Sequence, residues 1–345
     1  MTKNIFFMCN SRMVLGDSII MYSDIMQMIN ENPDYIIYFC HSSQRSQIVN
    51  LCFKNAIQSG KIIPLPINTH EVNKNYPSII QRIAKIIKVI VMFRRHIEFD
   101  KVILQNDGLT TVNILSKFIK SKTKPQIYIP HRSYSSNDKR IAVDFTYIEK
   151  KTFNRPTIGF YIGASSFNKS WNPKYFAELL DYIKKNFPTH DVNIYGFGGV
   201  NLTLFEKFQE EAKKYKYIQG IDYNSFINQN SLEDDISHAR GLSLIVANDS
   251  GFMHVGIVLK IPTIAIFGFD RDISYRTSNG TLLYSSHSKM SCSPCKNCGD
   301  FCKTKTQFNT KNGKTFEIFD CMGVENRMEE IFELTNKALN GIPAI

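Results

Sequence analysis

Apolar and polar positions follow two alternating patterns along this chain. Short apolar runs, typical of buried parallel strands, are separated by longer stretches with the 3.6-residue period of an amphipathic helix. In the first half the predicted strands are residues 4–9, 35–40, 61–65, 101–105 and 126–129, and the predicted helices are residues 18–30, 43–55, 77–95 and 111–120. Because parallel strands need long crossover connections, this alternation predicts a parallel sheet covered by helices.

The same pattern restarts after a polar, irregular stretch at residues 131–138 and further connecting sequence to Arg155. The second series predicts strands at 157–162, 192–195, 242–247 and 263–267, and helices at 173–187, 202–215, 232–239, 251–259 and 325–339. A chain of 345 residues exceeds one ordinary core. We therefore expect an α/β protein with two Rossmann-like domains, residues 1–150 and 151–345, facing each other across a cleft.

Composition and charge narrow the class of protein. Hydrophobic residues make up 43% and charged residues 21%, no apolar run approaches the roughly 20 residues of a membrane span, and the N-terminus lacks a secretory pattern. A cytoplasmic protein with reduced cysteines is expected. The net charge of +11 favours anionic partners. The basic segment 79–96 predicts a half-buried helix with a solvated basic face, with peripheral contact to an anionic membrane as the alternative. No nucleic-acid module is recognisable.

The most informative segment follows the predicted strand 242–247. Asn248-Asp249-Ser250-Gly251 ends that strand and begins a helix, with His254 one turn into it. A helix N-terminus offers unpaired N–H groups and a positive dipole to an anion, at the strand end where α/β sheets bind ligands. Helix capping by Asp249 or Ser250 is the simpler explanation, but it accounts for one residue of the four.

Two further turns have the same character. Gly16-Asp17 follows the first strand, where Asp17 is either a helix cap or a carboxylate directed into the cleft. Gly163 begins a turn with Ser165, Ser166 and Lys169, which could hold a phosphate with small residues, hydroxyls and a cation. The alternative for that turn is an exposed loop anchored by a tryptophan.

These segments together resemble a known family. They occur in the order Gly16-Asp17, Gly163-Ala-Ser-x-x-x-Lys169-x-Trp-x-Pro, Ser231-Leu-Glu-Asp-x-Ile, Asn248-Asp-Ser-Gly-x-x-His254 and Pro262-x-x-x-x-Phe-Gly268. The pattern resembles the bacterial heptosyltransferases of glycosyltransferase family 9, strongly over residues 157–270 and through the cysteines to about 330. In the N-terminal half Gly16-Asp17 is nearly the only anchor.

The resemblance implies a GT-B fold and inverting transfer of heptose from ADP-heptose without a catalytic metal. It implies that Asp17 is the general base and Lys169 contacts the donor phosphates. Asp249, Ser250, Gly251 and His254 then match the donor-binding turn. The chain departs from the family pattern after Tyr195, where no carboxylate occurs before Glu206, and after Gly268, which Phe-Asp-Arg-Asp follows.

A cluster of cysteines is the second strong signal. Cys292, Cys295, Cys298 and Cys302 have the spacing of a ferredoxin run, without its usual proline, and Cys321 follows. A single zinc or iron ion on Cys292, Cys295, Cys302 and Cys321, with Cys298 spare, fits the four-ligand rule. The autotransporter-modifying branch of the family has a similar cysteine-ligated iron finger. In this chain we expect the metal to tie residues 290–322 into one compact finger. Cysteines that bind nothing remain the simplest alternative.

The sequence therefore predicts a heptosyltransferase with one structural iron or zinc ion per chain. Its expected partners are a nucleotide-sugar donor and an acceptor hydroxyl, on an autotransporter serine or a lipopolysaccharide core sugar. Homo-oligomerisation is compatible with the sequence. The alternative is an iron–sulfur or zinc-finger protein whose GT-B part is a non-catalytic sugar-nucleotide-binding scaffold.

Overall fold

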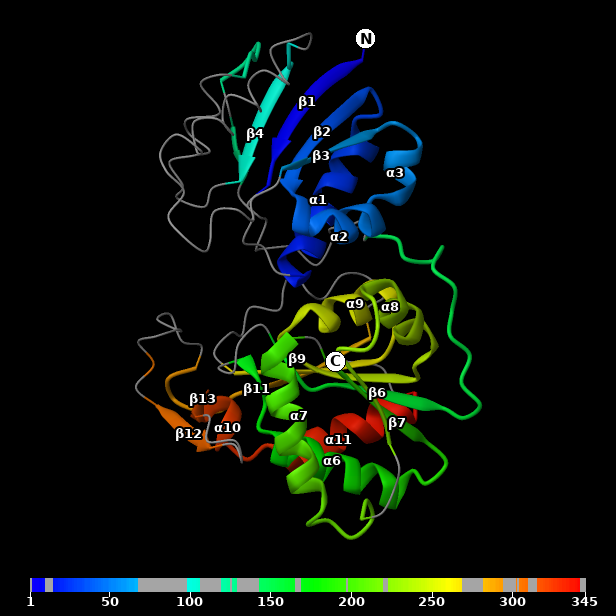
Figure 1. Ribbon diagram of the computed structural model, residues 1–345, viewed down its shortest axis with the longest axis vertical. Coiled ribbons are helices and arrows are strands. Elements are labelled where there is room, and N and C mark those ends of the chain that lie inside the picture. Colours follow the sequence, from blue (N-terminus) through cyan, green and yellow to red (C-terminus); the bar gives the residue numbers. More distant parts are fainter. Residues whose placement is uncertain are drawn as a thin grey trace. The chain divides into compact units, whose positions relative to one another are not determined.

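The computed structural model describes residues 2–9, 15–67, 98–105, 119–124, 126–128, 143–164, 169–196, 198–219, 223–268, 282–293, 302, 304–309 and 315–341. These residues form two compact units, each built on its own parallel sheet (Figure 1). The first unit holds the described residues of 2–9 and 17–128 together with 143, and the second holds 15, 16 and the described residues of 144–341.

The N-terminal unit has a five-stranded sheet in the order β3-β2-β1-β4-β5. Its strands are β1 (Lys3–Met8), β2 (Tyr35–Ser42), β3 (Ile62–Ile67), β4 (Lys101–Gln105) and β5 (Gln126–Tyr128), and its helices are α1 (Leu15–Glu31), the short 3-10 helix η1 (Ser43–Arg45), α2 (Ser46–Cys52) and α3 (Lys54–Gln58). The predicted single helix at 43–55 is wrong, because the chain leaves helical geometry at Phe53. The ring of Phe53 is buried, with centroids 4.6 Å from Tyr22 and 5.3 Å from Phe39, so core packing interrupts the helix.

The C-terminal unit has a six-stranded sheet in the order β11-β10-β9-β6-β7-β8. Its strands are β6 (Thr157–Tyr161), β7 (Asp191–Gly196), β8 (Asn224–Ile227), β9 (Leu244–Asn248), β10 (Thr263–Phe267) and β11 (Leu283–His287), and its helices are α6 (Pro173–Asn186), α7 (Gly198–Ala212), α8 (Leu232–Gly241), α9 (Gly251–Leu259), α10 (Asp320–Gly323) and α11 (Met328–Leu339). Helices α8 and α9 lie on one face of the sheet, and α6, α7 and α11 lie on the other (Figure 1). The main core lies under the second group and includes Phe160, Phe176, Leu180 and Phe208.

The predicted alternation of strands and helices is confirmed, and several elements were missed. Sequence reasoning did not find β8, β11, α10 or the antiparallel hairpin of β12 (Lys305–Asn309) and β13 (Thr315–Phe319). The closing helix predicted at 325–339 begins instead at Met328, whose N–H is bonded to the Asn326 side chain at 3.0 Å. The predicted helix 77–95 and most of 111–120 lie outside the described residues, and Ile119 and Lys120 are not helical. Within the described ranges, no helix is long and apolar enough to cross a membrane.

A polar residue is buried between the sheet and α8. Asp235 is fully buried, and its Oδ1 accepts a 2.7 Å hydrogen bond from Asn230, while its Oδ2 has no partner among the described residues. It lies close to the stacked rings of Tyr161 and Tyr195, whose centroids are 4.8 Å apart. Burial raises the pKa of Asp235 to about 7, opposed by the hydrogen bond from Asn230.

This carboxyl should make the C-terminal unit less stable as pH rises. The folded state holds the Asp235 proton up to about pH 7, whereas an unfolded Asp loses it near pH 4, so stability should fall with a slope of up to about 1.4 kcal/mol per pH unit between these values. Asp235→Asn should remove most of that slope and raise the melting temperature at pH 8 more than at pH 5. The control is Glu233→Gln, which changes an exposed carboxyl on the same helix. Equal pH profiles for the wild type and Asp235→Asn would contradict the assignment.

Candidate active site

The strand order of the C-terminal sheet reverses between β6 and β9. The chain runs from β6 outward to β7 and β8 on one side, and from β9 to β10 and β11 on the other. Ligands of open α/β sheets bind beyond the carboxyl ends of the strands at such a switch point. Tyr161 of β6 pairs with Ala247 of β9, so the segments that begin at Ile162 and Asn248 leave the sheet side by side.

A single buried amide joins these two segments. The Asn248 side chain is fully buried, and its Oδ1 accepts a hydrogen bond from the Trp171 backbone N–H at 2.9 Å. Its Nδ2 donates to the carbonyl oxygens of Ile162 at 3.2 Å and Gly163 at 3.4 Å. Asn248 therefore fixes the distance between the end of β9 and both ends of the turn from Gly163 to Trp171.

The turn after β9 leads directly into α9. Ser250 occupies the N-cap position in an extended conformation, and its side chain makes no capping hydrogen bond. The Asp249 backbone N–H donates to Ile266 of β10 at 3.2 Å, and His254 in the first turn of α9 is buried. The N-terminus of a helix carries the positive end of the helix dipole and is suited to an anion.

The other predicted site residues are described in part. Gly163 and Lys169 are half-buried on either side of the turn, and Ser165 and Ser166 lie outside the described residues. Asp17 is the third residue of α1, in the first turn, where a carboxylate is stabilised by the helix dipole. Its side chain lies outside the description, so its predicted role as base stays a prediction.

The cysteines are distributed over the same unit. Cys292 is exposed, Cys302 is half-buried and Cys321 is buried, while Cys295 and Cys298 lie outside the described residues. The hairpin pairs Lys305 with Phe319, and Asp320 N–H donates to the Thr304 carbonyl at 3.0 Å, so Cys302 and Cys321 flank one end of the hairpin. Burial, and then the neighbouring Cys302, raise the pKa of the Cys321 thiol to about 12, with Arg327 opposing. Among the described residues, no three potential ligands are arranged to hold a metal ion.

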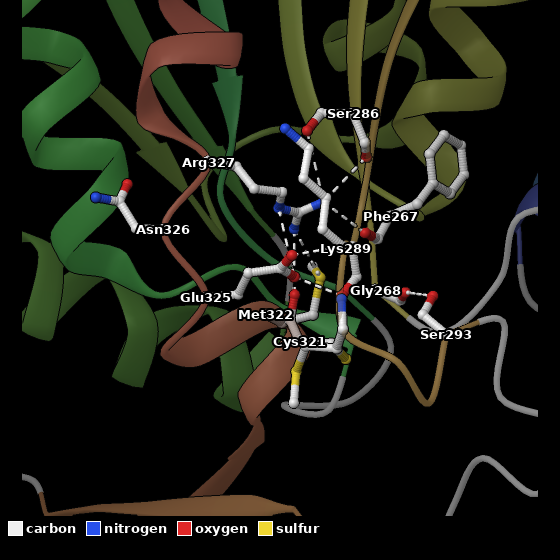
Figure 2. Close-up of polar contacts among 12 residues, drawn as sticks. Phe267, Gly268, Ser286, Lys289, Ser293, Cys321, Met322, Glu325, Asn326 and Arg327 are labelled. Carbon is white, nitrogen blue, oxygen red and sulfur yellow. Dashed lines mark hydrogen bonds and ion pairs between the residues drawn. The ribbon is translucent and has the colours of Figure 1, made fainter.

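A buried arginine connects the segment Asp320–Gly323, which forms α10 and is called the Cys321 turn below, to the sheet (Figure 2). Arg327 Nη1 donates to the carbonyls of Phe267, the last residue of β10, at 2.8 Å and of Ser286, one residue before the end of β11, at 3.1 Å. Its Nη2 donates to the Cys321 carbonyl at 3.2 Å. The Arg327 side chain has no exposed surface, and burial lowers its pKa while Glu325 opposes that effect.

Glu325 is the counter-ion and is itself held by the sheet end. Its Oε2 lies 3.9 Å from Arg327 Nε, and its carboxylate accepts hydrogen bonds from the Ser288 hydroxyl and the Lys289 backbone N–H. The turn also packs closely on Gly268, where an added Cβ would lie 2.8 Å from Met322 Cγ and 3.0 Å from Cys321 Sγ. A side chain at residue 268 would therefore displace the Cys321 turn.

Sequence reasoning missed three residues of this arrangement. Glu325 and Arg327 fall inside the predicted closing helix 325–339, and Asn172, which caps α6 and bonds to α10, has no predicted role beside Pro173. The available signal for Asn172 was its position before a proline at the helix start, which is typical of an N-cap. For Arg327 no local pattern exists, since its partners come from three separate elements.

Comparison with known proteins identifies the family to which this chain is similar and the fold that it shares. A family model described as glycosyltransferase family 9 (heptosyltransferase) matches residues 100–306. The lipooligosaccharide heptosyltransferase 2 of Campylobacter jejuni subsp. jejuni serotype O:2 is 30% identical over 131 residues, 37% of this chain and 38% of that protein. The chain thus matches well under half the length of this curated relative.

Two solved structures resemble the whole chain. A glycosyl transferase family 9 protein from Veillonella parvula DSM 2008 is 15% identical with a TM-score of 0.64, covering 98% of this chain and 97% of that one. TibC from enterotoxigenic E. coli H10407, described as a bacterial iron-containing dodecameric glycosyltransferase, is 13% identical with a TM-score of 0.56, covering 99% and 77%. TibC is also known in complex with ADP-D-beta-D-heptose. At these identities the likeness shows the fold, and the predicted GT-B class is confirmed.

Removing the buried guanidinium should destabilise the C-terminal unit. Arg327→Met leaves Glu325 without its counter-ion and the carbonyls of Phe267, Ser286 and Cys321 without this donor, so the free energy of unfolding should fall by about 3–5 kcal/mol. Urea unfolding can be followed by the fluorescence of Trp171, the chain's one tryptophan, which is buried in this unit.

The matched control is Lys289→Met. That side chain is 73% exposed, and its ion pair with Glu330 is 3.3 Å long, so its loss should cost less than about 1 kcal/mol. Similar midpoints and slopes for both variants would contradict a special role for Arg327.

Proposed function

The chain belongs to glycosyltransferase family 9, and from that premise we propose that it is an inverting heptosyltransferase using ADP-heptose. The observation that carries the proposal is the pair of turns at the switch point, tied together by Asn248. The binding of ADP-D-beta-D-heptose by TibC supports the same donor here.

The donor diphosphate would lie between Lys169 and the start of α9. A diphosphate carries several negative charges, and the turn from Gly163 to Trp171, to which Asn248 is bonded, contains the cationic Lys169. The start of α9 would attract a phosphate oxygen through the positive end of the helix dipole. Gly163, Ser165, Ser166, Asp249, Gly251 and His254 would complete the donor site.

The chemistry then needs one base and one source of positive charge. Asp17 would take the proton of the acceptor hydroxyl as that oxygen attacks the anomeric carbon. Lys169 and the N-terminus of α9 would stabilise the departing ADP, so that no catalytic metal is required. The acceptor hydroxyl belongs to a lipopolysaccharide core sugar or to a serine of a surface protein.

The cysteine segment would hold one structural iron or zinc ion. Thiolates suit both metals, and a site on Cys292, Cys295, Cys302 and Cys321 would close a segment that is too polar to form its own core. The hairpin end that Cys302 and Cys321 flank supports this ligand set, as does the iron in TibC. When bound, the ion would supply cross-linking and take no part in sugar transfer.

Donor preference can be tested on the wild-type protein, and the proposed roles of Asp17 as base and Lys169 as phosphate ligand can be separated with one variant of each. The purified protein should transfer or hydrolyse ADP-heptose in preference to UDP- and GDP-sugars. Asp17→Asn should lower turnover by about two to four orders of magnitude and leave ADP affinity unchanged, because a base acts only on the acceptor proton. Lys169→Ala should lower both turnover and ADP affinity, since its charge acts on the bound diphosphate.

Each variant is the control for the other, measured by steady-state kinetics and by calorimetry with ADP. Glu31→Gln, at the other end of α1, should change neither quantity. Near-normal turnover of Asp17→Asn would reduce Asp17 to a structural residue of α1. Unchanged ADP affinity in Lys169→Ala would remove that residue from the phosphate site.

Metal analysis should find about one iron or zinc ion per chain, following the four-ligand rule. Cys292→Ser and Cys321→Ser should lose the ion and lower the unfolding midpoint of the C-terminal unit, whereas Cys298→Ser should retain both. Several irons with acid-labile sulfide would instead favour an iron–sulfur cluster. A stable, metal-free protein would leave the cysteines without a ligand.

A further inference from the structure

The short helix α10 is held in place by hydrogen bonds to its C-terminal carbonyl groups. A helix leaves its last carbonyls without partners inside the helix. Here the Cys321 carbonyl accepts from Arg327, and the Val324 carbonyl accepts from the Tyr175 hydroxyl at 3.0 Å. The carbonyls of Met322 and Gly323 both accept from Asn172, through its backbone N–H at 2.9 Å and its Nδ2 at 2.8 Å.

Asn172 is also bonded to its own helix. Its Oδ1 accepts from the Lys174 backbone N–H at 3.0 Å, which caps α6, so both polar atoms of the buried side chain are used. The preceding residue, Trp171, donates its backbone N–H to Asn248. Two adjacent residues therefore join the end of β9 on one side to the Cys321 turn on the other.

We propose that Asn172 is a positioning residue, which couples the Cys321 turn to the segment that ends in Lys169 and Trp171. The inference rests on the proposed function, in which that segment binds the donor diphosphate. Movement of α10 away from α6 would release the Asn172 backbone and side chain together. Because Lys169 lies three residues earlier, the same movement would alter its position relative to the start of α9.

The simpler role for Asn172 is a helix cap, and the substitution Asn172→Asp separates the two. Aspartate caps helices as well as asparagine does, so α6 keeps its cap. A carboxylate cannot donate to the Gly323 carbonyl, so the side-chain bond to α10 is lost and only the backbone bond to Met322 remains. Asn172→Ser is the second variant, because serine also caps but places no charge beside that carbonyl.

The test is ADP binding to the metal-loaded protein, measured by calorimetry. Both Asn172 variants should raise the Kd for ADP at least tenfold and raise the donor KM without changing the acceptor KM. Tyr175→Phe is the matched control, because it removes one bond to the same turn from outside the donor segment; its Kd should stay within about twofold of wild type. A purely structural loss would lower the binding stoichiometry and leave the Kd of the folded fraction unchanged.

Coupling is tested by combining Asn172→Asp with Cys321→Ser. If both act through one connection, the double variant should bind ADP no more weakly than the weaker single variant. Multiplicative effects on Kd, or a wild-type Kd in both Asn172 variants, would overturn the inference. Wild-type protein that binds neither ADP nor ADP-heptose would overturn the proposed function itself, which is a distinct result.

Discussion

The C-terminal unit depends on the burial of one guanidinium group. Arg327 donates to the carbonyls of Phe267 on β10, Ser286 on β11 and Cys321 on α10, so one side chain joins α10 to two paired strands of the sheet. A planar group with several fixed donors can serve all three at once, which a lysine cannot. Because an unpaired buried charge is costly, Glu325 must lie beside it, and Glu325 is in turn held by Ser288 and Lys289. This requirement explains why helix α11 begins only at Met328.

Closer to the candidate donor site, neutral amide side chains join separate backbone segments as Arg327 does elsewhere. Asn248 and Asn172 each accept from one backbone N–H and donate to carbonyl oxygens. An amide meets both needs without adding charge, so the positive charge at the candidate donor site would come from Lys169 and the start of α9. A carboxylate at either position would repel the carbonyls that it faces and the anion expected nearby. The residues that hold the backbone here are therefore neutral asparagines, and the candidate phosphate-binding residue is a charged lysine.

The sequence allowed the layered α/β fold to be predicted, because buried parallel strands such as β6, β9 and β10 are apolar along their length. It also indicated the turns at the switch point, where polar residues follow those strands. It did not reveal β8, β11 or the hairpin, whose short strands mix polar and apolar residues. The roles of Arg327 and Asn172 also depend on distant partners, such as Ser286, 41 residues from Arg327, and Gly323, 151 residues from Asn172, and such pairings leave no local pattern.

The hairpin of β12 and β13 needs stabilisation from the rest of the C-terminal unit. A two-stranded hairpin is marginal by itself in water. Strand β13 buries Phe316, Ile318 and Phe319, but every described side chain of β12 is exposed or only half-buried, so the hairpin is held from one side. Besides this packing it is fixed at its base, where α10 is bonded to α6 and Arg327. A cross-link through Cys302 and Cys321 would act at that same base. It would therefore restrict the motion of the hairpin and, through α10, of the segment that ends in Trp171.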